Sequence, residues 1–452
     1  MRLRAGTAKV NITPPIHCPL AGFGARTHGA VGVRDELWAR ALYLDNGERE
    51  LALVSVEVLG LGWETVAALR RRVADKTGIP GECVMFSATH THAGPATGRR
   101  HDPNGIAARN LASLEDKLVG LVSWAKSRAV SVGMRTGRAE VRCGANRREW
   151  RNGEVVLGVN PDGPAYHYVD LFGTLGENGA LHAVWFCHPC HPLVLGQANY
   201  LITGDFVGAA ASYIESQTGG TALFANGFAG NITSIPDRNG EPADIDRVGR
   251  HLGAAVVQCV SRWDGPPRAE AVPLLALERE ILLPLEPVPS VEEAKAQMTE
   301  AEEELTAAVA AQNQLRIYRA RQAVAAAKER LTLAETGERP VGAPMRLQAM
   351  VIGDVVLLAA PGEIFIEYQT AIREASPFPE TICVGYSNGS VGYLPTAEAF
   401  PEGGYEVRSR IRHRGLAIVP EAAGVFVRGA LALLNETRTA LEEVRARAPR
   451  AL

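Results

Sequence analysis

Two histidines one residue apart, His90 and His92, are the first side chains in the chain whose types and spacing suit chemistry. They follow the apolar segment 83–86, which is typical of the end of a buried strand, and they precede Gly94 and Pro95. In an extended chain, residues i and i+2 point to the same side. A divalent metal can use one imidazole while the other acts as an acid, a base or a donor to the substrate. On this spacing alone, two ordinary histidines of a loop or core are an equally good interpretation.

Further residues of the same chemical kinds follow other predicted strands: His188 and His191, Glu363, and Tyr393 and Tyr405. Since α/β folds place their sites beyond the carboxyl ends of strands, we expect these segments to converge. Two histidines and one carboxylate are a common catalytic zinc set that leaves one position open for water. Bound zinc lowers the pKa of that water, which attacks a carbonyl while an Arg, Tyr or His stabilises the oxyanion. The glycine-rich loop 20–26 is a segment where backbone could approach a ligand.

The elements that must position these residues alternate between strands and helices. A hairpin across Asn46 and Gly47 is followed by helical periodicity over 63–76 and then by the strand that leads into His90. This strand–helix–strand order favours parallel pairing. We therefore predict an α/β fold of mixed sheets with flanking helices. The same patterns predict one strand over 133–150 and helices over 114–129, 207–217, 244–263, 365–374 and 420–445.

Residues 290–337 differ in character from the rest of the chain. Their first four residues form a capping-box signature, and Ala, Glu, Gln, Arg and Lys follow with spaced Leu and Val. We predict either one long helix or a helical hairpin that breaks near 312–314. The predicted organisation is a single catalytic domain, 1–285 and 341–452, with this helical arm, 286–340, inserted in it. The arm is expected to be solvated and without chemistry, and it is the segment through which a homo-oligomer could assemble.

The composition excludes several classes of protein. The chain has 452 residues, of which 46% are hydrophobic and 21% charged, as is ordinary for a folded protein with a large core. A formal net charge of −3 and the lack of a long apolar run predict neither nucleic acid nor membrane as a partner, which leaves a small-molecule substrate. The first residues carry no apolar signal core, so a cytoplasmic location is expected. Seven scattered cysteines do not suggest a disulfide framework.

The segment from Cys187 to His191 has the pattern C-x-x-C-H, which is that of covalent haem attachment. A haem or redox protein built on Cys187 and Cys190 is therefore an alternative. Haem attachment normally requires an exported chain, and the segment follows an apolar strand rather than opening a small helical domain. Pro192 also comes too soon for the helix start that a thioredoxin-like pair needs.

Six segments occur in the order of a known family. They are Ser87-Ala88-Thr89-His90-Thr91-His92-Ala93-Gly94-Pro95, Asn146-Arg147, Cys190-His191-Pro192, Gly230-Asn231-Ile232-Thr233, Pro361-Gly362-Glu363, and Gly392-Tyr393 with Tyr405-Glu406. Together they resemble the neutral/alkaline non-lysosomal ceramidases, specifically their catalytic N-terminal domain. The similarity spans most of 5–440 except the arm.

This resemblance implies a zinc amidohydrolase with one Zn²⁺ per chain. It implies His90 and His191 as the zinc histidines, Glu363 as the carboxylate ligand and Tyr393 as the tyrosine beside the metal. His188 stays open as a substitute for His191. Whether Tyr393 binds the metal directly or through water is also left open.

Three further residues, His92, Arg147 and Tyr405, match family residues that orient the substrate and stabilise the tetrahedral intermediate. Where the family carries Gly-Asp-x-Ser-Pro, this chain has Asn231 for the Asp and Thr233 for the Ser. Thr233 retains a hydroxyl for substrate contact, whereas Asn231 does not retain the charge. With no β-sandwich domain after the matched part and no secretion signal, we expect a smaller, water-soluble amide rather than ceramide.

The predicted function is a zinc-dependent hydrolase that cleaves the amide C–N bond of a small soluble N-acyl substrate through metal-activated water. A zinc-dependent ester or lactone hydrolase uses the same chemistry and is the first alternative. A non-catalytic metal-binding scaffold that assembles through the arm is the second.

Overall fold

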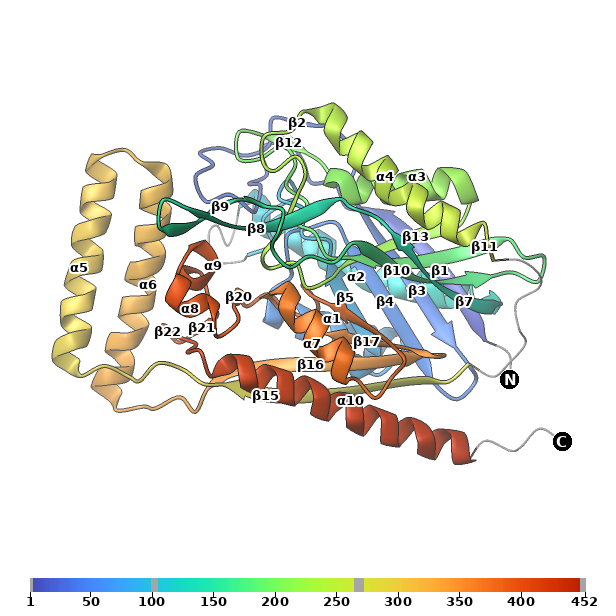
Figure 1. Ribbon diagram of the computed structural model, residues 1–452. Coiled ribbons are helices and arrows are strands. Elements are labelled where there is room, and N and C mark those ends of the chain that lie inside the picture. Colours follow the sequence, from blue (N-terminus) through green and yellow to red (C-terminus); the bar gives the residue numbers. More distant parts are fainter. Residues whose placement is uncertain (1–2, 99–104, 264–271, 448–452) are drawn as a thin grey trace.

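The computed structural model describes residues 3–98, 105–263 and 272–447 (Figure 1). Within these ranges the chain forms ten α-helices and several mixed sheets. The prediction of an α/β fold with mixed sheets and flanking helices is therefore confirmed. None of the helices in this part of the chain has the length and apolar character needed to cross a membrane.

The first sheet holds the strand that leads into His90. Its order is β5-β4-β3-β1-β6. The bounds of these strands are Val84–Ala88, Glu50–Val56, Trp38–Asp45, Arg4–Asn11 and Val130–Ser131. β3 and β4 form the predicted hairpin, and α1 (Trp63–Thr77) connects β4 to β5, which pair in parallel as predicted. Helix α2 (Ile106–Ser127) packs on this sheet. It begins earlier than residue 114 because Ala107 and Leu111 continue its buried stripe despite the weak helix former Asn110.

The second sheet holds the segment that precedes His191. Its order is β13-β11-β10-β7, with bounds Thr221–Asn226, Leu181–His188, Tyr168–Leu175 and Gly133–Glu140. β10 and β11 pair antiparallel, and β11 and β13 pair in parallel. Helices α3 (Asp205–Thr218) and α4 (Pro242–Val260) pack on each other above it (Figure 1). A short pair, β12 (Leu201–Ile202) with β2 (Gly32–Val33), lies outside this sheet.

The prediction of one strand over 133–150 is wrong. The segment forms two strands, β7 and then β8 (Gly144–Arg151), and β8 belongs to a third sheet with β14 (Ile232–Ser234) and β9 (Glu154–Asn160). Both strands have strand-like side chains, so the local pattern does not reveal that the chain changes partners between them. A Cβ at Gly144 would lie 2.5 Å from the Thr233 carbonyl, so the new pairing depends on a close backbone approach.

The fourth sheet delivers Glu363. Its order is β15-β16-β17-β19, with bounds Leu274–Leu283, Ala343–Ile352, Val355–Ala359 and Glu380–Val384. Helix α7 (Ile366–Ala375) joins β17 to its parallel neighbour β19, and α10 (Ala422–Arg447) packs along β15 and β16 (Figure 1). The short elements near the site are η1 (Gly81–Cys83), β18 (Glu363–Ile364), β20 (Tyr393–Leu394), α8 (Ala399–Glu402), α9 (Tyr405–Arg408), β21 (Arg412–His413) and β22 (Leu416–Ala417).

The arm is a hairpin of two helices, α5 (Val291–Ala310) and α6 (Gln314–Thr336), beside the main body in Figure 1. Ser290 and Glu293 form the predicted capping box at the start of α5. The buried positions of the two helices are mostly alanines: Ala294, Ala301 and Ala308 on α5, seven residues apart, and Ala320 and Ala327 on α6, followed by Leu333. A seven-residue spacing keeps one face toward a partner helix, and small side chains let the two backbones approach closely.

Candidate metal centre

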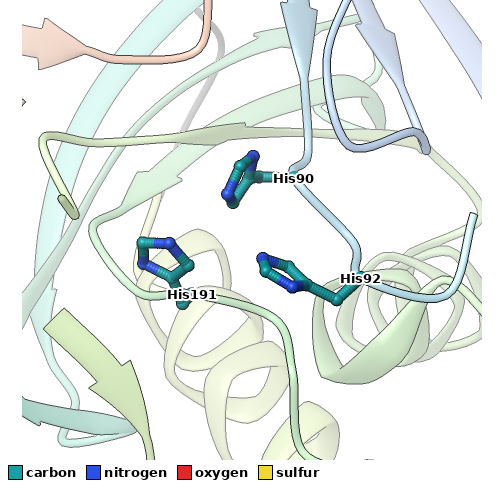
Figure 2. A group of neighbouring side chains, drawn as sticks. All are labelled: His90, His92 and His191. Carbon is teal, nitrogen blue, oxygen red and sulfur yellow. The ribbon is translucent and has the colours of Figure 1, made fainter. Parts of the chain in front are cut away.

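Three imidazoles converge at the centre of the molecule. The ligand atoms of His90, His92 and His191 all lie within 4.8 Å of one another, and Figure 2 shows the three rings gathered around a common space. His90 follows the end of β5, His92 lies in the loop beyond it, and His191 follows β11. The side chain of His191 is fully buried and that of His90 is 6% exposed. The expected convergence of strand ends therefore occurs, and it comes from two different sheets.

Backbone carbonyls orient two of these rings. His90 Nδ1 lies 2.7 Å from the Leu59 carbonyl, and His191 Nδ1 lies 2.8 Å from the Ala229 carbonyl. Because a carbonyl can only accept, both Nδ1 atoms carry the hydrogen, and in the neutral rings both Nε2 atoms are left as acceptors. Such second contacts fix the tautomer of histidines that bind metals through Nε2.

Glu363 joins the same space from β18. Its Oε2 lies 3.0 Å from His191 Nε2 and 3.4 Å from His90 Nε2. Burial alone would raise the pKa of the Glu363 carboxyl, but His90 and His191 outweigh this and hold that pKa well below its usual value. Burial and the charge of Arg147 lower the pKa of His191 to about 3.

These protonation states create a conflict that a cation would resolve. At neutral pH Glu363 is a carboxylate and His191 is a neutral ring whose Nε2 accepts, so the 3.0 Å contact brings two acceptors together. His90 Nε2 and both ring nitrogens of His92 are buried and have no hydrogen-bond partner in the described part of the chain. Two neutral imidazoles and a carboxylate are a donor set that suits a divalent metal such as zinc. The residues therefore fit a metal ion.

His92 differs from the other two histidines because neither of its ring nitrogens has a hydrogen-bond partner within the described ranges. Its backbone N–H donates to the Pro192 carbonyl at 3.1 Å, which ties it to the segment that carries His191. Burial, followed by the charges of His90 and His191, lowers its pKa well below 6.5, so the ring is neutral. His92 can thus act as a third ligand or as a proton acceptor, and geometry alone supports both.

Arg147 and two tyrosines line the same space. Arg147 is 4% exposed and donates from Nε to Glu406 Oε1 at 2.8 Å, whereas its buried Nη2 is unpartnered within the described ranges. Its Cζ lies 5.4 Å from the Tyr393 ring centroid, and the Tyr393 and Tyr405 rings are 5.6 Å apart. Burial and the charge of Glu363 raise the pKa of Tyr393 well above 10, so its phenol is a neutral donor. These side chains offer hydrogen bonds to a developing negative charge.

Two residues considered from the sequence lie elsewhere or are already engaged. His188 Nδ1 bonds the Tyr168 carbonyl at 2.9 Å, and His188 is not part of the three-histidine group. The Thr233 hydroxyl donates to Asp237 Oδ1 at 2.5 Å, and its side chain is fully buried. Thr233 instead contacts the site through its backbone, which forms a bridge with His191.

Asn231 has a structural reason for being an amide. Its Nδ2 donates to both carboxylate oxygens of Glu367, at 3.0 and 2.9 Å, while its Oδ1 accepts from the Ile366 backbone at the start of α7. An aspartate at this position would place two carboxylates in contact. Its backbone carbonyl also accepts from Arg147 N–H at 2.8 Å, so Asn231 holds Arg147 in position.

Sequence reasoning missed three aromatic residues near the site. The Tyr386 ring lies 4.2 Å from the His90 ring, and the Phe23 ring lies 5.0 Å from that of His92. Tyr318 of α6 covers Gly24, where any side chain would overlap its ring. The glycine-rich loop 20–26 did indicate a close approach of backbone near the site. Its glycines, however, make room for aromatic rings of the protein rather than for a ligand: a Cβ at Gly22 would lie 2.6 Å from the His92 ring.

The cysteines of the C-x-x-C-H segment lie in the core. Cys187 is 3% exposed, and Cys190 is fully buried. Burial raises the pKa of both thiols well above 9.0, so neither is a reactive thiolate at neutral pH. Their surroundings do not support a haem or redox site.

No protein-family model matches the chain. A curated sequence does: the neutral ceramidase of Pseudomonas aeruginosa is 29% identical over 262 residues, which is 53% of this chain and 38% of that protein. The chain is related to the neutral ceramidases. The match thus spans well under half the length of that neutral ceramidase.

Two solved ceramidase structures share the fold. The crystal structure of the P. aeruginosa neutral ceramidase superposes with a TM-score of 0.69 at 20% identity, over 96% of this chain and 75% of that one. A ceramidase complexed with C2 gives 0.74 at 19% identity, over 97% and 76% of the two chains. The likeness to these ceramidases therefore extends across almost the whole chain at the level of the backbone.

Proposed function

We propose that the chain is a zinc-dependent hydrolase that cleaves the amide C–N bond of a small, soluble N-acyl substrate. The observation that carries this proposal is the meeting of the Glu363 carboxylate with the Nε2 acceptors of His191 and His90, at 3.0 and 3.4 Å, in a buried site. The relationship to neutral ceramidases supports an amide as the bond that is cleaved.

We propose His90, His191 and Glu363 as the ligands of one zinc ion, with Tyr393 beside it. A zinc ion held there would lower the pKa of a bound water and polarise the scissile carbonyl. The neutral His191 ring and the ionised Glu363 carboxyl need no proton release before binding. His92 is the rival third ligand, because its nitrogens lie within the same 4.8 Å group.

The remaining polar groups have separate tasks. A neutral His92 can accept a proton from water at a free ring nitrogen and pass it to the leaving nitrogen. In that reaction the water oxygen bonds to the acyl carbon, the C–N bond breaks, and the products are a carboxylate and an amine. Arg147 Nη2 is a donor available to the oxyanion, and the neutral Tyr393 phenol lies beside Arg147. Tyr405 lies beside Tyr393 to hold the substrate.

The small substrate is proposed from the two departures in the family segment. The side chains of both residues hydrogen-bond to other parts of the protein: Asn231 donates to Glu367, and Thr233 donates to Asp237. The Thr233 hydroxyl is therefore not available for the substrate contact that the resemblance suggested, and the Asn231 amide is not available either. A substrate that is recognised mainly at its acyl and amide groups, by Arg147 and Tyr405, suits this arrangement.

The test compares two glutamates by elemental analysis and by hydrolysis of matched N-acyl amides and esters. We expect one zinc per native chain, and we expect Glu363→Gln to lose both the zinc and amide turnover. Glu367→Gln is the control, because Glu367 binds Asn231 rather than the histidines. A metal-free Glu363→Gln protein with full turnover would falsify the assignment of the zinc ligands. A native protein that hydrolyses esters faster than the matched amides would show that the ester, not the amide, is the bond cleaved.

A further inference from the structure

Tyr386, in the loop after β19, is a buried phenol with nothing to bond to. The residue is 4% exposed, and its hydroxyl has no hydrogen-bond partner among residues 3–98, 105–263 and 272–447. Buried tyrosine hydroxyls normally find a partner, and leaving one without a partner is destabilising. Tyr368, which is also 4% exposed, donates to the Pro395 carbonyl at 2.8 Å. Of these two buried phenols, Tyr368 has a hydrogen-bond acceptor and Tyr386 has none in the described chain.

The backbone of Tyr386 is also held in an unfavourable conformation. Its φ of +54° lies in the left-handed region, where the side chain of a bulky residue crowds the backbone. Its N–H donates to the Gly362 carbonyl at 3.2 Å, and its carbonyl accepts from Ala88 N–H at 3.1 Å. Gly362 precedes Glu363, and Ala88 lies two residues before His90. Tyr386 is thus tied to two of the three segments that supply the proposed ligands, those of His90 and Glu363. Strained residues tend to serve function at such places.

The groups around the Tyr386 ring belong to the site. Its ring lies 4.2 Å from that of His90 and 6.0 Å from that of His191. Burial and the charge of Glu363 raise the pKa of its phenol well above 10, and the charge of Arg147 opposes this shift. The phenol therefore keeps its hydrogen and stays a donor. Tyr386 and Arg147 Nη2 are both buried donors at the site that have no acceptor in the described part of the chain.

We propose that Tyr386 is a further catalytic residue, whose hydroxyl donates a hydrogen bond to the substrate carbonyl oxygen as that oxygen becomes negative. This rests on the proposed hydrolase function. Tyr386 keeps its proton throughout and forms no covalent bond. The missing acceptor is supplied by the substrate, and the donor is preorganised by the strained loop. The unsatisfied hydroxyl in the free protein is then the cost of a hydrogen bond that forms only when the carbonyl is present.

The test uses Tyr386→Phe, which removes the hydroxyl and keeps the ring. We expect unchanged zinc content, a melting temperature at or above that of the native protein, and kcat lower by about 100-fold, with KM within about twofold. Binding of a phosphinate analogue of the tested N-acyl substrate, measured by calorimetry on the zinc-loaded protein, is expected to weaken by the same factor. Binding of the carboxylate product is expected to change little.

Tyr368→Phe is the matched control, because it removes a satisfied phenol outside the site. It is expected to lower stability and leave kcat and analogue affinity unchanged. Tyr386→Leu is a second variant that lacks the hydroxyl, for use if the Phe variant does not fold. Native kcat and analogue affinity in either variant would overturn the proposal, and so would loss of zinc, which would make Tyr386 structural. If the native protein hydrolyses neither amides nor esters, the proposed function fails, whereas the analogue binding still decides the role of Tyr386.

Discussion

His188 and His191 lie three residues apart on one segment, yet they belong to different regions of the molecule. Both are buried, and both donate from Nδ1 to a backbone carbonyl, Tyr168 for His188 and Ala229 for His191. They differ at Nε2, which in His191 lies 3.0 Å from the Glu363 carboxylate and in His188 has no described partner. Burial and residue type therefore do not make a metal ligand. His191 is suited to be a ligand because β18 brings the Glu363 carboxylate next to its Nε2.

The surroundings of the two histidines differ in the same way. Near His188, the Asp170 carboxylate is held by Arg138 at 2.6 Å, by Arg373 at 2.7 Å and by the Tyr166 hydroxyl at 2.8 Å. The charges in that region are satisfied by the protein. The region around His191 instead leaves His90, His92, Arg147 and Tyr386 with buried polar atoms that have no partner in the described chain. Unsatisfied polar groups gathered in one place point to a ligand.

Truncating each histidine in turn separates the roles of His188 and His191. We expect His191→Ala to weaken zinc binding by more than about 100-fold and to abolish turnover, because a direct ligand is lost. His188→Ala is expected to keep its zinc and lose mainly stability, since it leaves a cavity and an unpaired carbonyl. Zinc content and hydrolysis rates decide the outcome. Zinc loss in His188→Ala with retention in His191→Ala would reverse the assignment.

A pair of arginines extends the comparison with a smaller effect. Arg147→Lys is expected to lower kcat by about 100-fold with zinc retained, because a lysine cannot hold Glu406 and also present a second donor to the oxyanion. Arg373→Lys weakens the contact with Asp170 and is expected to lower the unfolding temperature without changing kcat. Kinetics and thermal unfolding of both proteins are the measurements. Equal turnover in the two variants would remove Arg147 from the site.

The region around His188 also predicts a pH effect on stability. Burial lowers the pKa of His188 to about 4, despite the raising effects of the Tyr168 carbonyl and Asp170, whereas His167 and His251 lower it further. Between pH 6.5 and about 4, His188 therefore binds a proton in the unfolded chain but stays neutral in the folded chain. Stability is complete above pH 6.5 and falls as the pH drops toward 4, by on the order of 3 kcal/mol for this group.

Replacing His188 by Gln removes this titration while keeping a side-chain donor for Tyr168. We expect the free energy of unfolding of His188→Gln, measured by denaturant titration between pH 7 and 4, to fall less steeply than that of the native protein. Parallel curves for the two proteins would show that His188 is not the group responsible.

The smallest expected effect comes from the arm. Tyr318 lies against Gly24 in the loop that packs on His92, and it adds to the burial and Glu363 effects that raise the pKa of Tyr405. We expect Tyr318→Ala to change KM a few-fold with zinc and kcat retained. Tyr318→Phe, which keeps the ring, is the control and should leave KM unchanged.

Assembly through the arm stays a prediction, and the molecular mass in solution of a chain without 290–337 tests it.

The sequence predicted local structure well where one element carries its own signal. Gly47, in the turn after Asn46, has left-handed backbone, so the hairpin of β3 and β4 was visible. The capping box at Ser290 satisfies free N–H groups, so the start of α5 was visible as well. The sequence did not reveal the break within 133–150, because partner choice between sheets depends on residues far away, such as Thr233.

The candidate site was predictable in its residue types and less so in its details. His90, His191 and Glu363 stood after predicted strands, and they do lie together. Tyr386 was missed because a tyrosine in a loop is common. Its place near the histidines follows from a left-handed backbone and from hydrogen bonds to distant segments, which no local pattern encodes.

Anomalous diffraction at the zinc edge, from crystals of the zinc-loaded protein, identifies the third ligand. We predict one peak at about 2.0–2.2 Å from His90 Nε2, His191 Nε2 and a Glu363 oxygen, with His92 outside the coordination sphere. A peak held by His90, His92 and His191 without Glu363, or one beside His188, would contradict it.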